Sequence, residues 1–417
     1  MGQLVSPVEP KGFLTLAILE HTIKSSIFAV CWIIDEILYG RQLNKINLDT
    51  SDDSGIDMVF VVSAYRSAST HLARSLVQEQ TDSLSMVSPN SMMMSVPYLW
   101  VWKLVSWFVG EMPETKPQEI GTANGEPPMH PTLSKSEVRK WSQEKYSKEC
   151  LERHDFDPFL VDTLDLSFLS CHLNGLVWEY CFATQSPDVV RKEFHYAKHT
   201  PPNKRLYEVD FCNHIDRLAR KTVLFQQPYA KENEKTVVLF KGHFLSIVPA
   251  LQTKYPNAKF ITVLRDPCDR LKSAINYTAV NPSLASSMDR SNPEHWKLLA
   301  NTLEETEAEY CLQEVETFGT TNEHFLSIHF DAIATTSKQA DTIASIHQWF
   351  LGQGNNKASA TVSNGRKASS SKKTKKTKRY MVDKTLSELA IDETAYKNRL
   401  DDYIAYMNSV GTKKKII

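Results

Sequence analysis

The run MVFVVSAYRSAST, residues 58–70, decides the fold class of this chain. Its first half, Met58 to Val62, is a continuous apolar run rich in β-branched residues, which is typical of a strand buried on both faces of a parallel sheet. Its second half is a loop of small and hydroxyl residues that leads into a helix predicted to begin near Thr70. A buried strand followed by such a loop and a helix indicates an α/β domain.

Three further stretches of the chain repeat this order of strand, loop and helix. The predicted strands are 236–240, 259–264 and 325–330, and the helices after them cover about 244–255, 268–277 and 338–351. Parallel strands bring the loops at their carboxyl ends to one edge of the sheet, where ligands of open α/β folds bind. We therefore predict a three-layer α/β/α fold with a central, mainly parallel sheet, similar to that of P-loop NTPases.

The positions of these strands also divide the chain into parts. We expect residues 1–55 to form an N-terminal helical extension and residues 56–417 to form one domain. The long stretch between the first two predicted strands, about 80–235, reads as a helical insertion that builds the acceptor side of a pocket. Residues 353–379 are of low complexity and are predicted to form a mobile basic loop. The helical periodicity from Tyr380 to Met407 predicts a tail that packs back on the domain.

Composition excludes several classes of protein. The chain has 417 residues, of which 41% are hydrophobic and 23% are charged, which excludes a wholly disordered chain, a collagen and a disulfide mini-scaffold. Its net charge of −1 includes eight Lys or Arg and no acid in residues 366–379, so the rest of the chain carries −9. That basic segment can be a solvated charge run, a patch for anionic surfaces or nuclear import, or a segment that closes over a cofactor. Seven scattered cysteines without a CxxC motif indicate reduced thiols and no structural metal.

The segment 13–38 is apolar but contains charged residues. Glu20 and Lys24 lie within it, and each charge in the centre of a membrane span is costly, so spanning is the weaker interpretation. Its apolar residues follow helical spacing and predict a helix that lies on the protein body, which we favour, or on a membrane surface: Ile23, Ile27, Val30, Ile34 and Leu38. We expect a cytoplasmic protein that can contact a membrane, and the alternative is a Golgi membrane protein with this segment as its single anchor.

A first candidate site lies in the loop after the first strand. Arg66 is surrounded there by the hydroxyl residues Ser67, Ser69 and Thr70, just where a helix begins. A helix start presents free N–H groups and the positive end of the helix dipole, and arginine binds phosphate or sulfonate oxygens in pairs, so the loop is predicted to bind an anion. Simple capping of the helix by a hydroxyl residue is the alternative. The Walker A pattern G-x-x-x-x-G-K-[ST] does not occur, which argues against a kinase or ATPase of that type.

A second candidate site follows the strand 259–264. The sequence there reads RDPCDRLKS, residues 265–273, with a proline where a helix would begin. Arg265 and Ser273 can converge on one phosphate if the helix runs as predicted. The alternative is that Arg265 forms a surface ion pair with Asp266 or Asp269, and such pairs contribute little.

Together the two motifs resemble those of the sulfotransferase family, which uses 3'-phosphoadenosine 5'-phosphosulfate, PAPS. The resemblance includes YPNAKF, residues 255–260, and Phe330-Asp331, and spans roughly residues 56–352 in the family's order. The branch it most resembles has arginine in the first loop. The resemblance implies that one loop holds the 5'-phosphosulfate and the other the 3'-phosphate. The first loop comprises Arg66, Ser67, Ala68, Ser69 and Thr70, and the second contributes Arg265 and Ser273.

The resemblance also implies a reaction. The chain is expected to transfer a sulfonate group from PAPS to a hydroxyl or amine, without a metal, on a small-molecule or carbohydrate acceptor. No nucleic acid partner is expected. The alternatives are a catalytically impaired protein that binds PAPS or its product 3'-phosphoadenosine 5'-phosphate, PAP, and a P-loop enzyme of phosphoryl transfer.

Two departures from the family pattern concern catalysis. Ala68 stands where the family has glycine, and a positive φ there would cost alanine on the order of 1 kcal/mol. Related branches also place a glutamate where residues 88–94 read SPNSMMM, without a carboxylate. His243 is our candidate for the missing base, since imidazole titrates near neutrality. Lys241, two residues earlier, is expected to clamp the sulfonate together with Arg66. His154 and His172 are interpreted as structural residues.

Overall fold

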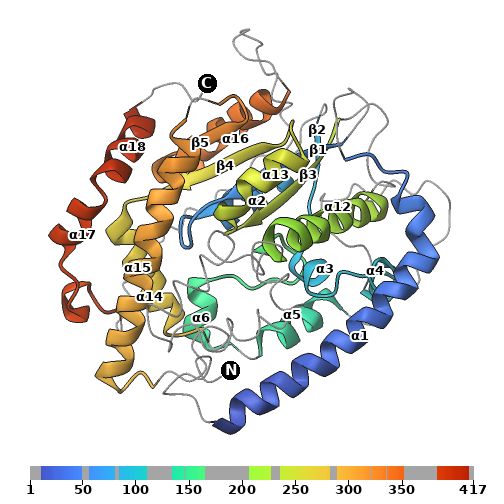
Figure 1. Cartoon of the computed structure of the whole chain (residues 1–417), viewed down its shortest axis with the longest axis horizontal. Helices are drawn as coiled ribbons and strands as arrows, with labels where there is room; N and C mark the ends of the chain where they lie inside the picture. The colour runs from blue at the N-terminus through green and yellow to red at the C-terminus, as the bar shows by residue number, and fades with distance from the viewer. Residues whose placement is uncertain are drawn as a thin grey trace.

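The computed structural model describes the chain in eleven stretches (Figure 1). They are 11–48, 56–79, 84–109, 134–144, 146–164, 206–226, 235–281, 289–320, 322–334, 336–351 and 383–412. His172 and the whole basic segment 366–379 lie outside these residues, so the predictions made for them stay predictions.

A five-stranded sheet forms the centre of the molecule. All its neighbouring strands pair in parallel, in the order β2-β3-β1-β4-β5. The strands are β1 (Asp57–Val62), β2 (Leu84–Val87), β3 (Lys235–Gly242), β4 (Lys259–Leu264) and β5 (Phe325–His329). The predicted α/β/α fold with a parallel sheet is confirmed, and the four predicted strands lie within a few residues of where the sequence placed them.

Strand β2 corrects the interpretation of 80–235 as a purely helical insertion. It extends the sheet beside β3, with Met86 opposite Val237. Its sequence LSMV is only four residues long, contains one β-branched residue and is buried throughout. Neither alternation of polar and apolar residues nor a long β-branched run marks it as a strand, so only its pairing with β3 reveals it.

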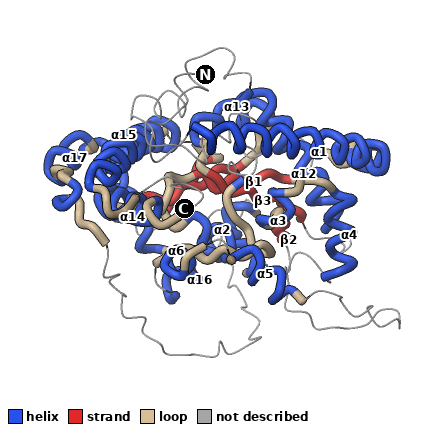
Figure 2. Tube along the Cα trace, turned by 90° about the horizontal axis from the view of Figure 1, so that it is seen from below, coloured by secondary structure: helices blue, strands red, loops and turns tan. Residues whose placement is uncertain are grey.

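Helices cover both faces of the sheet, as Figure 2 shows with the strands between two helical layers. Helices α2 (Ser69–Gln78) and α16 (Thr336–Phe350) pack on one face, and α12 (Cys212–Gln226) and α13 (Val248–Lys254) on the other. The other helices are α1 (Lys11–Leu43), α3 (Ser91–Ser95), α4 (Leu99–Val109), α5 (Lys135–Gln143), α6 (Lys148–Arg153), α14 (Pro267–Thr278), α15 (Pro293–Phe318), α17 (Glu393–Arg399) and α18 (Asp401–Thr412). Shorter helical turns are η2 (Leu206–Phe211), η4 (Leu245–Ile247), η5 (Phe330–Ala332) and η6 (Ser387–Leu389).

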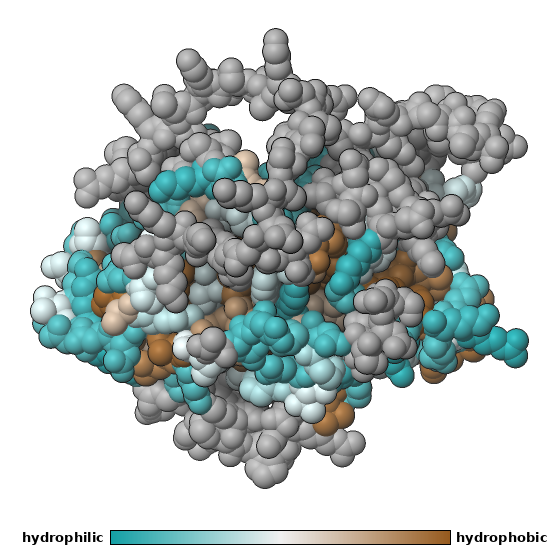
Figure 3. All heavy atoms as spheres, turned by 90° about the horizontal axis from the view of Figure 1, so that it is seen from above, coloured by the Kyte–Doolittle hydropathy of each residue, from teal (hydrophilic) through white to brown (hydrophobic). Residues whose placement is uncertain are grey.

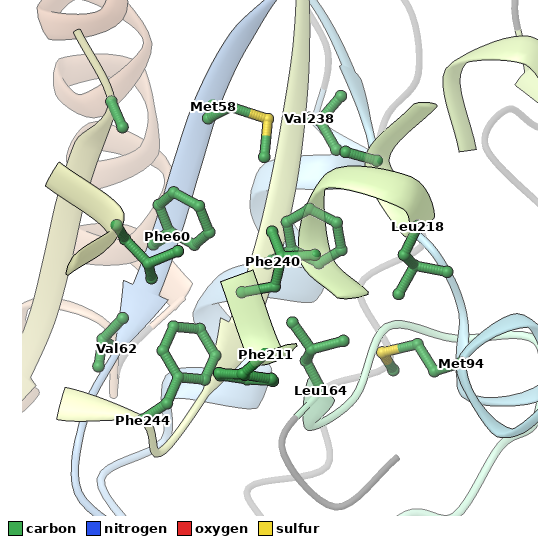
Figure 4. Close-up of a cluster of buried hydrophobic side chains, with 14 of the residues drawn as sticks. Met58, Phe60, Val62, Met94, Leu164, Phe211, Leu218, Val238, Phe240 and Phe244 are labelled. Atoms are coloured by element: carbon green, nitrogen blue, oxygen red, sulfur yellow. The ribbon is translucent and has the colours of Figure 1, made fainter. Parts of the chain in front are cut away.

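The alternation of side chains along each strand builds two separate cores. Met58, Phe60 and Val62 point to the face covered by α12 and α13, whereas Val59 and Val61 point to the face covered by α2 and α16. Figure 4 shows the first of these cores, where side chains of β1 and β3 meet those of the insertion. The ring of Phe60 stacks on that of Phe260 with centroids 5.2 Å apart. Because the strands are apolar on both faces, the sheet edge is the place left for polar residues.

Helix α1 packs on the body with the opposite face from the one expected. The stripe of five aliphatic residues predicted to face the protein, Ile23, Ile27, Val30, Ile34 and Leu38, is between 37% and 58% exposed. The prediction that this stripe packs on the protein body is therefore wrong. No helix in the described ranges, α1 included, combines the length and apolar character needed to cross a membrane.

A buried acid explains how α1 is oriented. The Asp35 carboxylate accepts hydrogen bonds from the backbone N–H groups of Leu99 and Trp100, at 3.0 and 3.1 Å, where α4 begins. It also lies 2.5 Å from the Lys221 ammonium of α12. A carboxylate is favourable at the positive end of a helix dipole, so Asp35 turns toward α4 and the aliphatic stripe turns outward. On the face seen in Figure 3, hydrophobic patches alternate with hydrophilic surface.

The C-terminal residues return to the domain as predicted. They form α17 and α18, which lie across the molecule from α1 in Figure 1. Tyr396, Leu400 and Tyr403 are buried against α14 and α15. This packing brings the Tyr403 hydroxyl under the end of β4, where it touches the second candidate site.

Candidate functional site

The loop after β1 turns sharply from strand into helix. Arg66 and Ala68 have positive φ angles of 62° and 71°, and α2 begins directly after them at Ser69. Ala68 therefore has the positive φ that the family's glycine would adopt without strain, and this conformation costs the alanine about 1 kcal/mol. No side chain caps α2, because its N-cap residue is Ala68. The first N–H groups of α2 therefore have no side-chain partner at the N-cap and face the carboxyl edge of the sheet, as an anion site requires.

The hydroxyl residues of this loop differ in their surroundings. Ser67 and Ser69 are buried and Thr70 is half-buried. Among the described residues, the buried Ser67 Oγ has no hydrogen-bond partner. A buried hydroxyl without a partner is costly in a finished core, so this atom fits a ligand better than a purely structural role.

The second loop lies against the first. Asp266 caps α14 by accepting hydrogen bonds from the N–H groups of Cys268 and Asp269, both at 3.0 Å. Arg265 forms no ion pair with either neighbouring acid in the described part of the chain. Its Nη1 instead donates to the Arg66 carbonyl at 2.9 Å, and its guanidinium lies 4.7 Å from the centre of the Phe330 ring. The alternative of a surface ion pair is thus not what the structure contains.

Arg265 has one hydrogen-bond donor that is not used within the described residues. Its Nε is buried, and no group among the described residues accepts from it. Burial lowers the pKa of the guanidinium, and the neighbouring charges of Arg66 and Arg270 lower it further against the opposing effect of Asp269. Arginine stays charged under such shifts, because its ordinary pKa is above 12. A buried cation with an unused donor beside another arginine is suited to an incoming anion.

Arg66 connects the two loops. Its Nε donates to Ser273 Oγ at 3.2 Å, and its Nη2 donates to the Arg153 carbonyl at 3.1 Å. The guanidinium carbon lies 4.5 Å from the centre of the Tyr277 ring. The structure therefore brings Arg66, Arg265 and Ser273 together. Among the described residues, Ser273 Oγ accepts a hydrogen bond from Arg66 and not from Arg265.

Lys241 and His243 follow the end of β3 at the same edge. The Lys241 ammonium donates to Thr163 Oγ1 and, at 3.3 Å, to His243 Nε2. His243 Nδ1 lies 2.8 Å from the Ser63 carbonyl, which can only accept, so Nδ1 carries the proton and Nε2 accepts from lysine. Burial and the Lys241 charge hold the pKa of His243 well below its usual range. His243 is a neutral residue whose basic nitrogen faces an ammonium.

Comparison with known proteins identifies the architecture. No protein-family model matches the chain, and no curated protein matches it. A sulfotransferase from Mycobacterium avium matches with a TM-score of 0.51 and 11% identity, over 89% of this chain and 80% of that one. The chain has a sulfotransferase fold. A sulfotransferase from Mycobacterium tuberculosis H37Rv matches at a TM-score of 0.46 and 11% identity, over 88% of this chain and 80% of that one. At these identities the likeness concerns the fold alone.

Within this sulfotransferase fold, a buried ionic network holds the two loops in place. Arg270 is fully buried; its Nη1 donates to Glu314 at 2.9 Å and its Nε donates to Glu307 at 2.8 Å. The other Glu314 oxygen accepts from the Ala64 N–H of the first loop at 3.2 Å. The Tyr403 hydroxyl joins this network, since it accepts from Arg270 at 3.2 Å and donates to the Arg265 carbonyl at 3.0 Å.

Sequence reasoning did not assign Arg270, Glu307 or Glu314 to the site. The signal was present but weak: Glu307 and Glu314 are seven residues apart and so share one face of a helix, and most of the other buried residues of that helix are apolar. Acids on an apolar helical face need a buried cation, and Arg270 is the cation that the motif RDPxxR supplies.

Two further residues at this edge were missed or dismissed. His154, interpreted as structural, pairs its Nε2 with Asp162 Oδ2 at 3.2 Å. Thr163, the residue after Asp162, forms a single parallel bridge with Lys241. No three His, Cys, Asp or Glu side chains gather as a metal site in the described ranges, and the expectation of a metal-free reaction stays an expectation.

Proposed function

We propose that the chain is a sulfotransferase that uses PAPS to sulfonate a hydroxyl or amine of a small-molecule or carbohydrate acceptor. One observation supports this most strongly. The two arginine loops converge, because Arg265 donates to the Arg66 carbonyl, and each contributes one buried polar atom without a partner among the described residues, Ser67 Oγ and Arg265 Nε. A nucleotide with anionic groups on both the 3' and the 5' position of its ribose would supply an acceptor to each.

The proposed division of roles follows the resemblance of the two loops to the motifs of the sulfotransferase family. Arg66, Ser67, Ser69, Thr70 and the N–H groups at the start of α2, with Ala68 at the turn, would hold the 5'-phosphosulfate. Arg265 and Ser273 would hold the 3'-phosphate, and this group separates PAPS from ATP-like nucleotides. The 5'-phosphosulfate and the 3'-phosphate of PAPS would then each meet hydrogen-bond donors that the fold has already oriented.

The proposed chemistry is a direct sulfonate transfer. The bond between sulfur and the bridging phosphate oxygen breaks, its electron pair leaves with PAP, and sulfur binds the acceptor atom, whose proton passes to a base. Arg66 and Lys241 are the two cations that would stabilise negative charge on the bridging oxygen in this proposal. His243 holds the Lys241 ammonium through its Nε2, which makes it a positioning residue for that cation in this proposal.

The test is the thermal stability of the protein with PAP, compared with ADP and with ATP and magnesium. Saturation at 100 times the dissociation constant should stabilise the fold by about 2.7 kcal/mol. Arg265→Ala should weaken PAP binding by about 10- to 150-fold, because a charge-assisted hydrogen bond contributes roughly 1.5–3 kcal/mol.

Arg399→Ala is the control for that variant, since Arg399 is exposed at the end of α17 and its hydrogen bonds among the described residues go to Glu305. A response to ATP and magnesium but none to PAP would replace the proposal with phosphoryl transfer. PAP binding by a protein that never turns over PAPS would instead identify a binding protein that has lost catalysis.

We further propose that the exposed stripe of α1 binds a membrane surface. Where the structure describes the side chains of this helix, seven large aliphatic ones are exposed, including Ile37 at 77%, and Trp107 of the neighbouring α4 is 57% exposed. An aliphatic helix face with an exposed tryptophan nearby is typical of a helix lying in the membrane interface.

Binding to lipid vesicles tests this surface. The double substitution Ile27→Glu and Ile37→Glu should weaken sedimentation with phosphatidylcholine and phosphatidylserine vesicles by at least about 10-fold, because burying each isoleucine contributes roughly 1.5–3 kcal/mol. Gln42→Glu, at an exposed position of the same helix, adds a like charge without removing apolar area. Equal sedimentation of all three proteins would show that the stripe does not bind lipid.

A further inference from the structure

His154 and Asp162 form an imidazole–carboxylate pair next to the proposed reaction centre. His154 ends α6, and its Nε2 lies 3.2 Å from Asp162 Oδ2. Asp162 is held in turn by Arg74, whose Nη2 lies 3.8 Å from the same oxygen. The ring of His154 packs against Phe156 and Tyr277, with centroid distances of 4.6 and 5.7 Å. The imidazole is thus fixed on three sides.

The charge state of Asp162 determines which histidine nitrogen is free. Burial alone would raise the pKa of Asp162, but the hydrogen bond from His154 and the charges of Lys241 and Arg74 lower it well below its usual range. An ionised carboxylate only accepts, so His154 Nε2 carries the proton. Nδ1 is then the basic nitrogen, and no hydrogen bond to it is found among the described residues. The His154 side chain is 19% exposed.

The pair is tied to both cations that the proposed function assigns to the sulfonate. Arg66 donates to the carbonyl of Arg153, the residue before His154, and lies over the Tyr277 ring on which His154 packs. At the other end, Thr163 follows Asp162 directly and accepts from the Lys241 ammonium. His154 therefore lies at the carboxyl edge of the sheet, within one residue of a contact to Arg66.

His154 is better arranged as a base than His243. The unprotonated nitrogen of His243 accepts from Lys241, and burial and the lysine charge lower the pKa of this imidazole. A proton from an acceptor hydroxyl would have to displace that ammonium. His154 has the opposite arrangement, since its proton-bearing nitrogen faces a carboxylate that stabilises the imidazolium formed when Nδ1 takes a proton.

We propose that His154 is the general base of the sulfonate transfer and that Asp162 positions it, in place of the glutamate missing from residues 88–94. This inference rests on the proposed function. As the acceptor oxygen bonds to sulfur, its proton moves to His154 Nδ1, while the bond from sulfur to the bridging oxygen breaks and its electrons leave with PAP. The imidazolium then returns the proton to solvent.

The test measures PAP release from PAPS with two classes of acceptor and with water alone, so that the natural acceptor need not be known. His154→Gln should lower kcat by about 100- to 10,000-fold with aliphatic alcohols, while the dissociation constant for PAP changes less than about 3-fold. The loss should be much smaller with para-nitrophenol, because this acidic phenol ionises without a base. A residue with only a structural role would not discriminate between the two acceptors.

His324→Gln provides the matched control. His324 is likewise partly exposed and lies 3.8 Å from an acid, Glu323, but it precedes β5 at the opposite edge of the sheet. It should leave kcat with both acceptors unchanged.

The pairing of the two residues is tested by a double variant. Asp162→Asn keeps the oxygen that accepts from the Thr163 N–H but no longer favours the imidazolium. It should lower kcat with alcohols and leave PAP binding intact, and the variant carrying both substitutions should be no worse than His154→Gln alone, because the two act as one unit.

The outcomes separate this inference from the function on which it rests. If His154→Gln retains the wild-type kcat with alcohols, or if losses are multiplied in the double variant, the dyad is overturned while the sulfotransferase stands. If the wild type binds PAP but releases none from PAPS with any acceptor or with water, no base is in use and the inference also falls. If PAP does not bind at all, the proposed function itself fails.

Discussion

Replacing Glu314 with alanine is expected to lower the free energy of unfolding by about 3–5 kcal/mol, because it leaves the buried Arg270 guanidinium short of one of its two carboxylates. Arg270 is fully buried and Glu314 is its partner at 2.9 Å. The same glutamate accepts from the Ala64 N–H and from Thr262 Oγ1, so the variant also removes a buried acceptor from both groups. Denaturant unfolding measures the loss.

Two variants show whether charge is the cause. Glu316→Ala changes an exposed glutamate of the same helix and should alter stability by no more than about 0.5 kcal/mol. The triple variant Arg270→Met, Glu307→Leu and Glu314→Leu removes the whole network and should be more stable than Glu314→Ala, since no charge stays buried without a partner. If Glu314→Ala is as mild as the surface control, the network does not hold the loops.

This network has a consequence for the site as well as for stability. Glu314 reaches the first loop through Ala64, and Tyr403 reaches the second through the Arg265 carbonyl. Both loops that we propose to bind PAPS are therefore connected by hydrogen bonds, through Glu314 and Tyr403, to one buried arginine, Arg270. Glu314→Gln, which keeps an oxygen for Ala64 and loses the charge, should fold and show weaker PAP binding than the wild type.

Arg66→Ala is expected to lower kcat by about 100- to 1,000-fold, the effect of removing one oriented donor from a charged transition state. The guanidinium is already held by Ser273 Oγ, the Arg153 carbonyl and the Tyr277 ring, so it needs no reorganisation when charge develops. PAP affinity should fall by less than about 10-fold, because under the proposed function Arg265 and the start of α2 would still hold the nucleotide. Steady-state turnover of PAPS and calorimetric binding of PAP give the two values.

Arg66→Lys separates charge from geometry. Lysine keeps the cation but cannot make the fork of hydrogen bonds that places Arg66 between Ser273 and Arg153, so turnover should recover only in part. Losses of equal size in kcat and in PAP affinity for Arg66→Ala would contradict a role specific to the transition state.

Much of the fold followed from local patterns. Strands β1, β3 and β4 contain short apolar runs bounded by polar loops, as a strand buried on both faces requires, and β5 alternates half-buried with buried residues at the end of the sheet. The shared sheet edge then follows from parallel pairing, so the meeting of the loops around Arg66 and Arg265 could be predicted before their contacts were known. Strand β2 carried no such signal, since LSMV becomes a strand only through its pairing with β3.

The sequence by itself determined the α/β class, the four main strands and the two arginine loops, because these depend on residues close together in the chain. Tertiary structure decided which polar groups meet. Asp35 finds α4 across 64 residues, and this contact turns the aliphatic stripe of α1 outward. Arg66 donates to Ser273, which is 207 residues away in the sequence, and Arg270 donates to Glu314, which is 44 residues away. His154 lies only eight residues from Asp162, but the role that we propose for this pair depends on the tertiary contact between Thr163 and Lys241. A buried charge requires a partner, but its residue type does not say which one, and the packing of the whole chain makes that choice.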